Sequence, residues 1–350
     1  MAKREINMDY LRIFACFMVI FLHASAQNWH VADVHSLEWK IFNIYDCLVR
    51  SCVPLFFMIS GKLFLTRKEF PSLSQLYKKN ILKIFVIYIL WTLFYAVDIY
   101  GLHQINKLFS VDGLLYALTH AKYHLWYLPA LLGIYFLLPI LWTITHYEDG
   151  KYLPYACIMF IVFGILFPTL KELPFVIDDI KIFLGKYTYA LSGSSGYFLC
   201  AYYIDQNKDK LNKIKSKYLI LLFLFIVFFA SQINGYYAKI VGNPTALFYD
   251  SNTLFVFIEA IILFILFLRI PSFHLKKRYF NFIIILSRYT LLIYLSHVFV
   301  LEHLKMYFHI STFSFFAGFS VPLLTILVFV ICASTAFVID HIPFIRKWIM

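Results

Sequence analysis

The stretch "YLRIFACFMVIFLHAS", residues 10–25, decides how the rest of the chain is interpreted. It follows a short charged start and is apolar for long enough to cross a bilayer as a helix. Arg12 lies near one of its ends and His23 near the other. Ionisable groups inside a membrane helix are costly and usually functional, so the segment predicts more than an anchor.

The composition of the whole chain indicates a membrane protein. Of its 350 residues, 62% are hydrophobic, 20% are aromatic and only 14% are charged. A soluble domain carries about 25% charged residues. This much apolar surface cannot be hidden from water in one core, so we expect a bilayer to be the solvent. The first apolar run has no clear small-residue cleavage site after it, which favours a retained span over a signal peptide.

The cysteines show neither metal-ligand spacing nor a secreted disulfide pattern, so we expect them to fill the core and we expect no metal site. The six are Cys16, Cys47, Cys52, Cys157, Cys200 and Cys332.

Hydropathy predicts an all-α, polytopic bundle of about ten transmembrane helices, forming a single domain over residues 1–350. The sixth segment is the least hydropathic and is rich in Gly, Ser and Tyr, which suits a helix packed inside the bundle. Residues 111–120 are expected to form a short surface helix. The predicted spans are residues 8–27, 41–65, 80–100, 124–145, 152–169, 186–204, 217–234, 252–270, 282–301 and 318–339.

Positive charge gathers in the loops that follow even-numbered spans. Residues 66–79, 205–217 and 271–280 are rich in Lys and Arg, whereas the intervening loops are poorer. Because basic residues mark cytoplasmic loops, this predicts that both termini are cytoplasmic. The net charge of +12 is therefore explained by the cytoplasmic loops, where basic side chains can contact anionic lipid headgroups. Nucleic acid is not an expected partner.

The two ionisable residues of the first span share one face of the helix. Arg12 and His23 are 11 residues apart, which is three turns plus about 20° and about 16 Å along the axis. Cys16 and Val19 continue that face, so it is polar at its ends and small in the middle. This pattern predicts the lining of a narrow path across the membrane.

A simpler interpretation of each residue stays open. Arg12 could reach the headgroups while paired with Asp9, one turn earlier. His23 could be a hydrogen-bonding partner of a neighbouring helix. Their common face favours a shared functional role.

Other spans carry further ionisable residues. Asp46 and Arg50, at i and i+4, predict an ion pair within one helix. Glu259 is a lone carboxyl inside an apolar segment, so it needs a histidine or arginine of another span as its partner. Arg288 and His297 are nine residues apart and are therefore expected on opposite faces.

Pro54 and Gly61 in the second span predict a bend or a close helix approach. His124 and Trp126 open the fourth span, where they are either anchors at the membrane interface or part of a site. Two interpretations of Tyr294 and His297, one turn apart, stay open: they face the interior together as part of a site, or His297 makes a structural hydrogen bond.

Four stretches, in this order, resemble the acyltransferase-3 integral-membrane acyltransferases, a family that includes many bacterial surface-polysaccharide O-acetyltransferases. They are the Arg12-x10-His23 pair, "VPLFFMISGKLFL" (53–65), "HLWYLPALL" (124–132) and "LSRYTLLIYLSHVFV" (286–300). The resemblance covers essentially the whole chain. It departs at the family's R-x-x-R motif, where this chain has Asn80 and Lys83; positive charge is kept, but not the bidentate arginine geometry.

The resemblance implies acyl transfer, with acetyl as the expected group. The donor is cytoplasmic acetyl-CoA, and the acceptor is a hydroxyl of a cell-surface glycan or lipid-linked sugar at the bacterial plasma membrane. His23 would be the general base or the covalent acyl carrier. The expected catalytic residues are His23, Arg12, Glu259 and His297, with Glu259 orienting His23. The donor's phosphates would bind Arg12, Lys79 and Lys83, and the acceptor would contact His124, Trp126 and Tyr294.

Two other classes remain open from the residues alone. A multi-pass transporter or flippase could use the charged stripe as a substrate or proton path, although no internal repeat is visible. A sensory or scaffold protein has little need for so many ionisable groups in its spans. Uptake without acyl-CoA turnover would favour the transporter.

Overall fold

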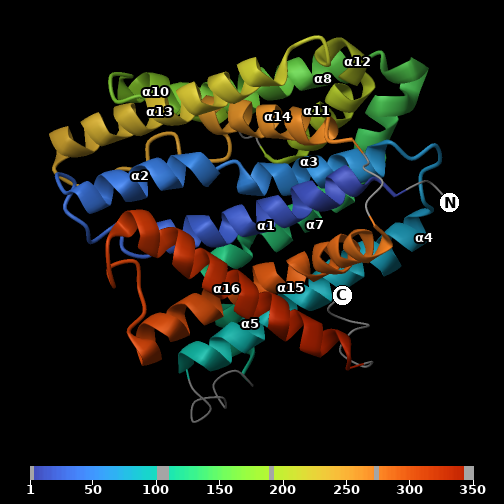
Figure 1. The fold of residues 1–350 in the computed structure, drawn as a ribbon. Coiled ribbons are helices and arrows are strands. Elements are labelled where there is room, and N and C mark those ends of the chain that lie inside the picture. The colour runs from blue at the N-terminus through green and yellow to red at the C-terminus, as the bar shows by residue number, and fades with distance from the viewer. Residues whose placement is uncertain (1–3, 101–109, 189–192, 272–275, 343–350) are drawn as a thin grey trace.

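The protein is helical throughout its described part. The structure is a computed structural model, and it describes residues 4–100, 110–188, 193–271 and 276–342 (Figure 1). Those residues form helices and connecting loops and include no β-strand. The predicted all-α bundle is confirmed.

The helices, in chain order, have the following bounds. They are α1 (Ile6–Ala26), α2 (Leu37–Val49), α3 (Cys52–Leu65), α4 (Leu73–Leu76), the π-helical turn η1 (Tyr77–Ile81), α5 (Leu82–Tyr100), α6 (Val111–Thr119), the 3-10 turn η3 (Tyr123–Trp126), α7 (Tyr127–His146), η4 (Tyr147–Gly150), α8 (Leu153–Met159), η5 (Phe160–Leu166), α9 (Phe167–Glu172), α10 (Asp178–Thr188), α11 (Ser195–Gln206), α12 (Lys208–Leu211), α13 (Ser216–Val241), α14 (Leu254–Leu268), α15 (Lys277–Phe308) and α16 (Ala317–Asp340).

Eight helical segments of the described chain are long and apolar enough to cross a membrane, so this is an integral, multi-pass membrane protein. α14 is a further apolar helix of 15 residues, shorter than the others. The predicted surface helix is also present as α6. The eight segments are Ile6–Ala26, Leu37–Leu65, Leu73–Ile99, Tyr123–Gly150, Leu153–Glu172, Ser216–Val241, Lys277–Phe308 and Ala317–Asp340.

The predicted sixth span, residues 186–204, is not one continuous helix. α10 ends at Thr188 and α11 begins at Ser195, while residues 189–192 lie outside the described part. Gly193, just before α11, has φ +130°, a conformation that L side chains rarely adopt. α11 is consequently a helix of only 12 residues, and it packs against α3 inside the bundle.

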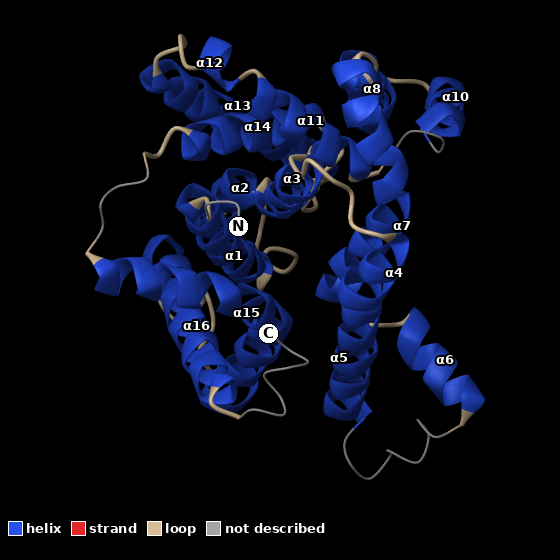
Figure 2. Ribbon diagram, turned by 90° about the vertical axis from the view of Figure 1, so that its right-hand side faces the viewer, coloured by secondary structure: helices blue, strands red, loops and turns tan. Residues whose placement is uncertain are grey.

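α1 lies at the centre of the bundle. It packs against α2 and α3 on one side and against α15 and α16 on the other (Figure 2). α1 and α15 run parallel in a constant register, because Arg12 bonds Ser287 and Cys16 bonds Thr290. The same offset brings His23 against His297. This packing is what assembles the site described below.

The start of α1 and the end of α16 lie on the same side of the bundle (Figure 1). An even number of crossings places the two ends of a chain on one side of a membrane. The cytoplasmic location of both termini remains a prediction from the basic loops.

A buried ion pair ties the start of the chain to α3 and α11. The Lys62 Nζ lies 2.6 Å from Asp205 Oδ1 and 3.0 Å from Glu5 Oε2, and Lys62 is only 3% exposed. We expect Asp205→Ala to destabilise the protein by about 3 kcal/mol, because it leaves a buried ammonium with one exposed partner. The thermal unfolding midpoint of purified protein in detergent measures this.

Lys151→Ala is the matched control, since Lys151 pairs with Glu148 on the surface and should leave the midpoint unchanged. The double variant Lys62→Met with Asp205→Leu should recover most of the loss. An Asp205→Ala protein as stable as the wild type would contradict the assignment.

Candidate active site

A cavity of about 920 Å³ reaches into the bundle beside the second half of α1. His23 and Val19 line it from α1, and Trp126 lines it from the start of the fourth predicted span. Further walls come from the junction of α2 and α3, the turn before α11 and the loop before α14. The cavity therefore joins segments far apart in sequence around one histidine of the opening stretch.

Three histidines from three elements meet at this cavity. The ring centroid of His23 lies 5.0 Å from that of His297 on α15 and 6.4 Å from that of His124 on η3. The His124 and His297 centroids are 5.2 Å apart. His124 and His297 are buried, at 2% and 0% exposure, whereas His23 is only partly buried. His23 is thus the member of the cluster that faces the cavity most openly.

Free ring nitrogens remain in this cluster. Nδ1 of His297 lies 2.6 Å from the carbonyl oxygen of Tyr294, so Nδ1 donates and carries the hydrogen. Its Nε2, like Nδ1 of His124, is buried without a hydrogen-bond partner in the described structure. No described residue hydrogen-bonds the His23 ring. A histidine free of such bonds beside a cavity can take a proton from a ligand.

Two tyrosines fix the positions of these rings. The Tyr294 hydroxyl donates to the backbone carbonyl of His124 and so ties η3 to α15. The Tyr95 hydroxyl donates to the carbonyl of Leu295 at 2.8 Å and accepts from the amide of Phe299 at 3.2 Å. Tyr294 was expected at the site. Tyr95 was not, because it is one of three tyrosines in α5 and nothing in the sequence alone distinguishes it from Tyr88 and Tyr100.

The opposite wall carries a positive charge. Arg50 lines the cavity and forms the predicted ion pair with Asp46, which is confirmed. Glu259 is 1% exposed on α14, and Arg50 is the cation that interacts with it electrostatically. No ion pair or hydrogen bond of Glu259 is present among the described residues, and its Oε2 is buried without a hydrogen-bond partner, so the expected pairing with a histidine or arginine remains a prediction. No contact between Glu259 and His23 is present in the described chain, so Glu259 does not orient that ring directly.

Comparison with protein families decides the identity. A family model described as an acyltransferase domain, that of acyltransferase-3, matches residues 5–340. The chain belongs to the acyltransferase-3 family. It is accordingly a membrane acyltransferase, with an acyl donor and an acceptor as its substrates. Comparisons with curated proteins and with solved structures gave no match.

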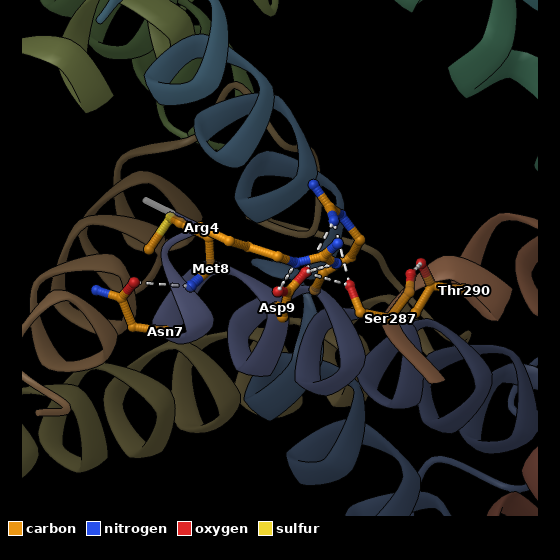
Figure 3. Close-up of polar contacts among 7 residues, drawn as sticks. Arg4, Asn7, Met8, Asp9, Ser287 and Thr290 are labelled. Atoms are coloured by element: carbon orange, nitrogen blue, oxygen red, sulfur yellow. Dashed lines mark hydrogen bonds and ion pairs between the residues drawn. The ribbon is translucent and has the colours of Figure 1, made fainter. Parts of the chain in front are cut away.

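Arg12, the other member of the acyltransferase-3 pair, lies in a polar network at the start of α1. Its Nη1 is 3.4 Å from Asp9 Oδ1 and 3.2 Å from the Ser287 hydroxyl. Asp9 is also held by Arg4 through two bonds of 2.7 and 2.9 Å and accepts from Ser287 at 2.7 Å (Figure 3). The expected Arg12–Asp9 pair is present, and the Arg12 side chain keeps 27% of its surface exposed.

The stripe between Arg12 and His23 is closed at Cys16 but not at Val19. Cys16 is 0% exposed and donates to the Thr290 carbonyl at 3.5 Å, whereas Val19 lines the cavity together with His23. The predicted path is therefore interrupted where Cys16 packs against α15, and only its second half lines a cavity in the described structure.

The remaining predicted residues lie apart from the cavity. Lys79 is exposed on η1 and Lys83 is partly buried at the start of α5. This end of the acyltransferase-3 bundle is also the end at which α1 begins (Figure 1). Arg288 is exposed and His297 buried, as their expected opposite faces require.

Proposed function

We propose that this chain is a membrane O-acyltransferase of the bacterial plasma membrane. It moves an acyl group, acetyl in the expected case, from cytoplasmic acyl-CoA to a hydroxyl of a cell-surface glycan or lipid-linked sugar. Residues 1–350 act as one acyltransferase domain in this proposal. The observation that carries it is the placement of His23, whose ring has no described hydrogen-bond partner, on a cavity of about 920 Å³. Small-molecule sites have volumes of about 300–1,000 Å³.

His23 has two chemically complete roles. As a general base, its imidazole takes the proton of the acceptor hydroxyl while the oxygen attacks the acyl carbon. As a nucleophile, it first takes the acyl group and then passes it to the acceptor. His297 and His124 flank the ring. Trp126, at 48% exposure on the cavity wall, offers an aromatic face to a sugar ring.

The two roles separate in an experiment without acceptor. Purified protein is incubated with radiolabelled acetyl-CoA, denatured and tested for bound label. Label that stays on the wild type and is absent from His23→Gln supports the covalent role. Unlabelled protein that still transfers acetyl when acceptor is added supports the general-base role.

Arg12, with Lys79 and Lys83, is proposed to bind the phosphates of the donor at the cytoplasmic end. Charge-assisted hydrogen bonds contribute about 1.5–3 kcal/mol. We therefore expect Arg12→Ala to raise KM for acetyl-CoA at least about tenfold, with a smaller effect on kcat. Steady-state kinetics of the purified variant measures both constants.

Arg4→Ala is the matched control, because Arg4 binds the same carboxylate of Asp9 yet leaves the Arg12 contacts in place. It should keep the wild-type KM. An Arg12→Ala protein with unchanged KM would show that Arg12 serves only the network with Asp9 and Ser287.

The transporter alternative needs a path across the membrane, and Cys16, which is buried against α15 between Arg12 and the cavity, supports the enzyme instead. Proteoliposomes with radiolabelled acetyl-CoA and lipid-linked sugars test the two functions together. Acyl transfer predicts label in the sugar fraction. Uptake of sugar into the vesicles without thioester cleavage would favour the transporter and contradict the proposal.

A further inference from the structure

Arg50 occupies the wall of the cavity at a break between two helices. α2 ends at Val49 and α3 begins at Cys52, with Arg50 between them. Pro54, in the first turn of α3, has no amide hydrogen to donate to the carbonyl of Arg50, which favours a break between the two helices at this point. Arg50 and His23 both line the cavity, and the charge of Arg50 acts on the His23 ring.

The guanidinium of Arg50 is held on two sides. Asp46, one turn earlier, forms an ion pair with its Nε. The ring of Tyr249, from the loop before α14, lies 4.3 Å from its Cζ, within range of a cation–π contact. The Asp46 ion pair involves Nε alone, and no hydrogen bond from the two terminal nitrogens occurs in the described part of the chain. The side chain keeps 24% of its surface exposed.

The surrounding charges explain why this arginine stays fixed. Asp46 and Glu259 are both 1% exposed, and both interact electrostatically with Arg50. If the partly exposed Arg50 side chain turned away from Asp46, it would leave that buried carboxylate without its ion-pair partner, so the pair holds the guanidinium in place. Fixed donors of this kind stabilise negative charge that develops during a reaction, at little cost of reorganisation.

We propose that Arg50 binds the oxyanion formed during acyl transfer, an inference that rests on the proposed function. The acceptor oxygen attacks the thioester carbonyl carbon, and the carbonyl π electrons move to its oxygen, which the terminal N–H groups of Arg50 bind. His23 takes the hydroxyl proton. The oxyanion then re-forms the carbonyl, the carbon–sulfur bond breaks, and the thiolate leaves with the proton from His23. If His23 first carries the acyl group, its ring nitrogen attacks the thioester carbon and the thiolate leaves. The acceptor hydroxyl then attacks the acyl-imidazole, the carbon–nitrogen bond breaks, and the hydroxyl proton ends on the released imidazole. Arg50 binds the oxyanion of each of the two tetrahedral intermediates.

The test compares Arg50→Met, which keeps the side-chain length without charge, with the wild type. Purified full-length protein is assayed with radiolabelled acetyl-CoA and lipid-linked sugars. We expect kcat to fall about 10²–10³-fold, with KM for both substrates unchanged. Arg50→Lys should recover only part of kcat, because it restores the charge but not the fork of donors. Arg288→Met, on the exposed face of α15, should behave as the wild type.

Folding is followed separately by the thermal unfolding midpoint. If Arg50→Met does not fold, the double variant with Asp46→Asn removes the stranded carboxylate and is assayed in its place. A folded variant with wild-type kcat would overturn the inference. So would an unchanged kcat with a raised KM, since Arg50 would then bind an anionic group of a substrate. A wild type that transfers nothing contradicts the proposed function itself, and the inference falls with it.

Discussion

Replacing His23 by alanine is expected to abolish acyl transfer while leaving the protein folded and in the membrane. Loss of a general base costs about 10²–10⁴ in rate, and loss of a covalent carrier costs more. The fold should survive, because the ring faces a cavity and has no described hydrogen-bond partner to strand. Membranes containing the variant are assayed for label transferred from acetyl-CoA, and the purified variant for its unfolding midpoint.

The control is another histidine at the membrane. His303 lies on α15, bonds the Phe299 carbonyl at 2.9 Å and is partly exposed beside Asp98. His303→Ala should keep transfer at the wild-type level. Near-wild-type transfer by His23→Ala would contradict the assignment of His23 to the active site, whatever the result for His303→Ala.

The second large effect concerns Gly61, where α3 meets α11. A Cβ atom at Gly61 would lie 2.4 Å from the Cα and 2.8 Å from the carbonyl oxygen of Phe198. Backbone atoms cannot move aside without separating the two helices, and overpacking of a tight interface costs about 3 kcal/mol or more. We therefore expect Gly61→Ala to lower the unfolding midpoint sharply and to reduce the yield of monodisperse protein.

Gly133 on α7 supplies the comparison, because a Cβ there meets nothing within 4 Å. Alanine favours helices more than glycine does, so Gly133→Ala should be neutral or slightly stabilising. Equal midpoints for Gly61→Ala and the wild type would mean that the two helices do not approach this closely.

Helical periodicity predicted much of the bundle and part of the site. Long apolar runs predicted the spans, and the close approach at Gly61 followed from a glycine inside one of them. Four predicted site residues, His23, His124, Trp126 and Tyr294, line one cavity. These four residues could be named in advance because each lies in a recognisable sequence motif at a predicted depth in the membrane.

The rest depends on contacts between distant segments. The closure of the stripe at Cys16 follows from the register of α15, which periodicity within α1 does not contain. Arg50 was expected only as the partner of Asp46, because the loop that brings Tyr249 to it lies about 200 residues away. The electrostatic interaction of Arg50 with Glu259 likewise joins segments about 200 residues apart.

The central claim is that this membrane protein transfers acyl groups at the His23 cavity. Its most direct test is CoA release by purified full-length protein given radiolabelled acetyl-CoA and lipid-linked sugars, with wild type and His23→Ala measured side by side. The account predicts release by the wild type that rises when acceptor is added and disappears in His23→Ala. Equal CoA release by the two proteins would contradict it. So would a wild type that releases no CoA and transfers no label from acetyl-CoA to the sugars.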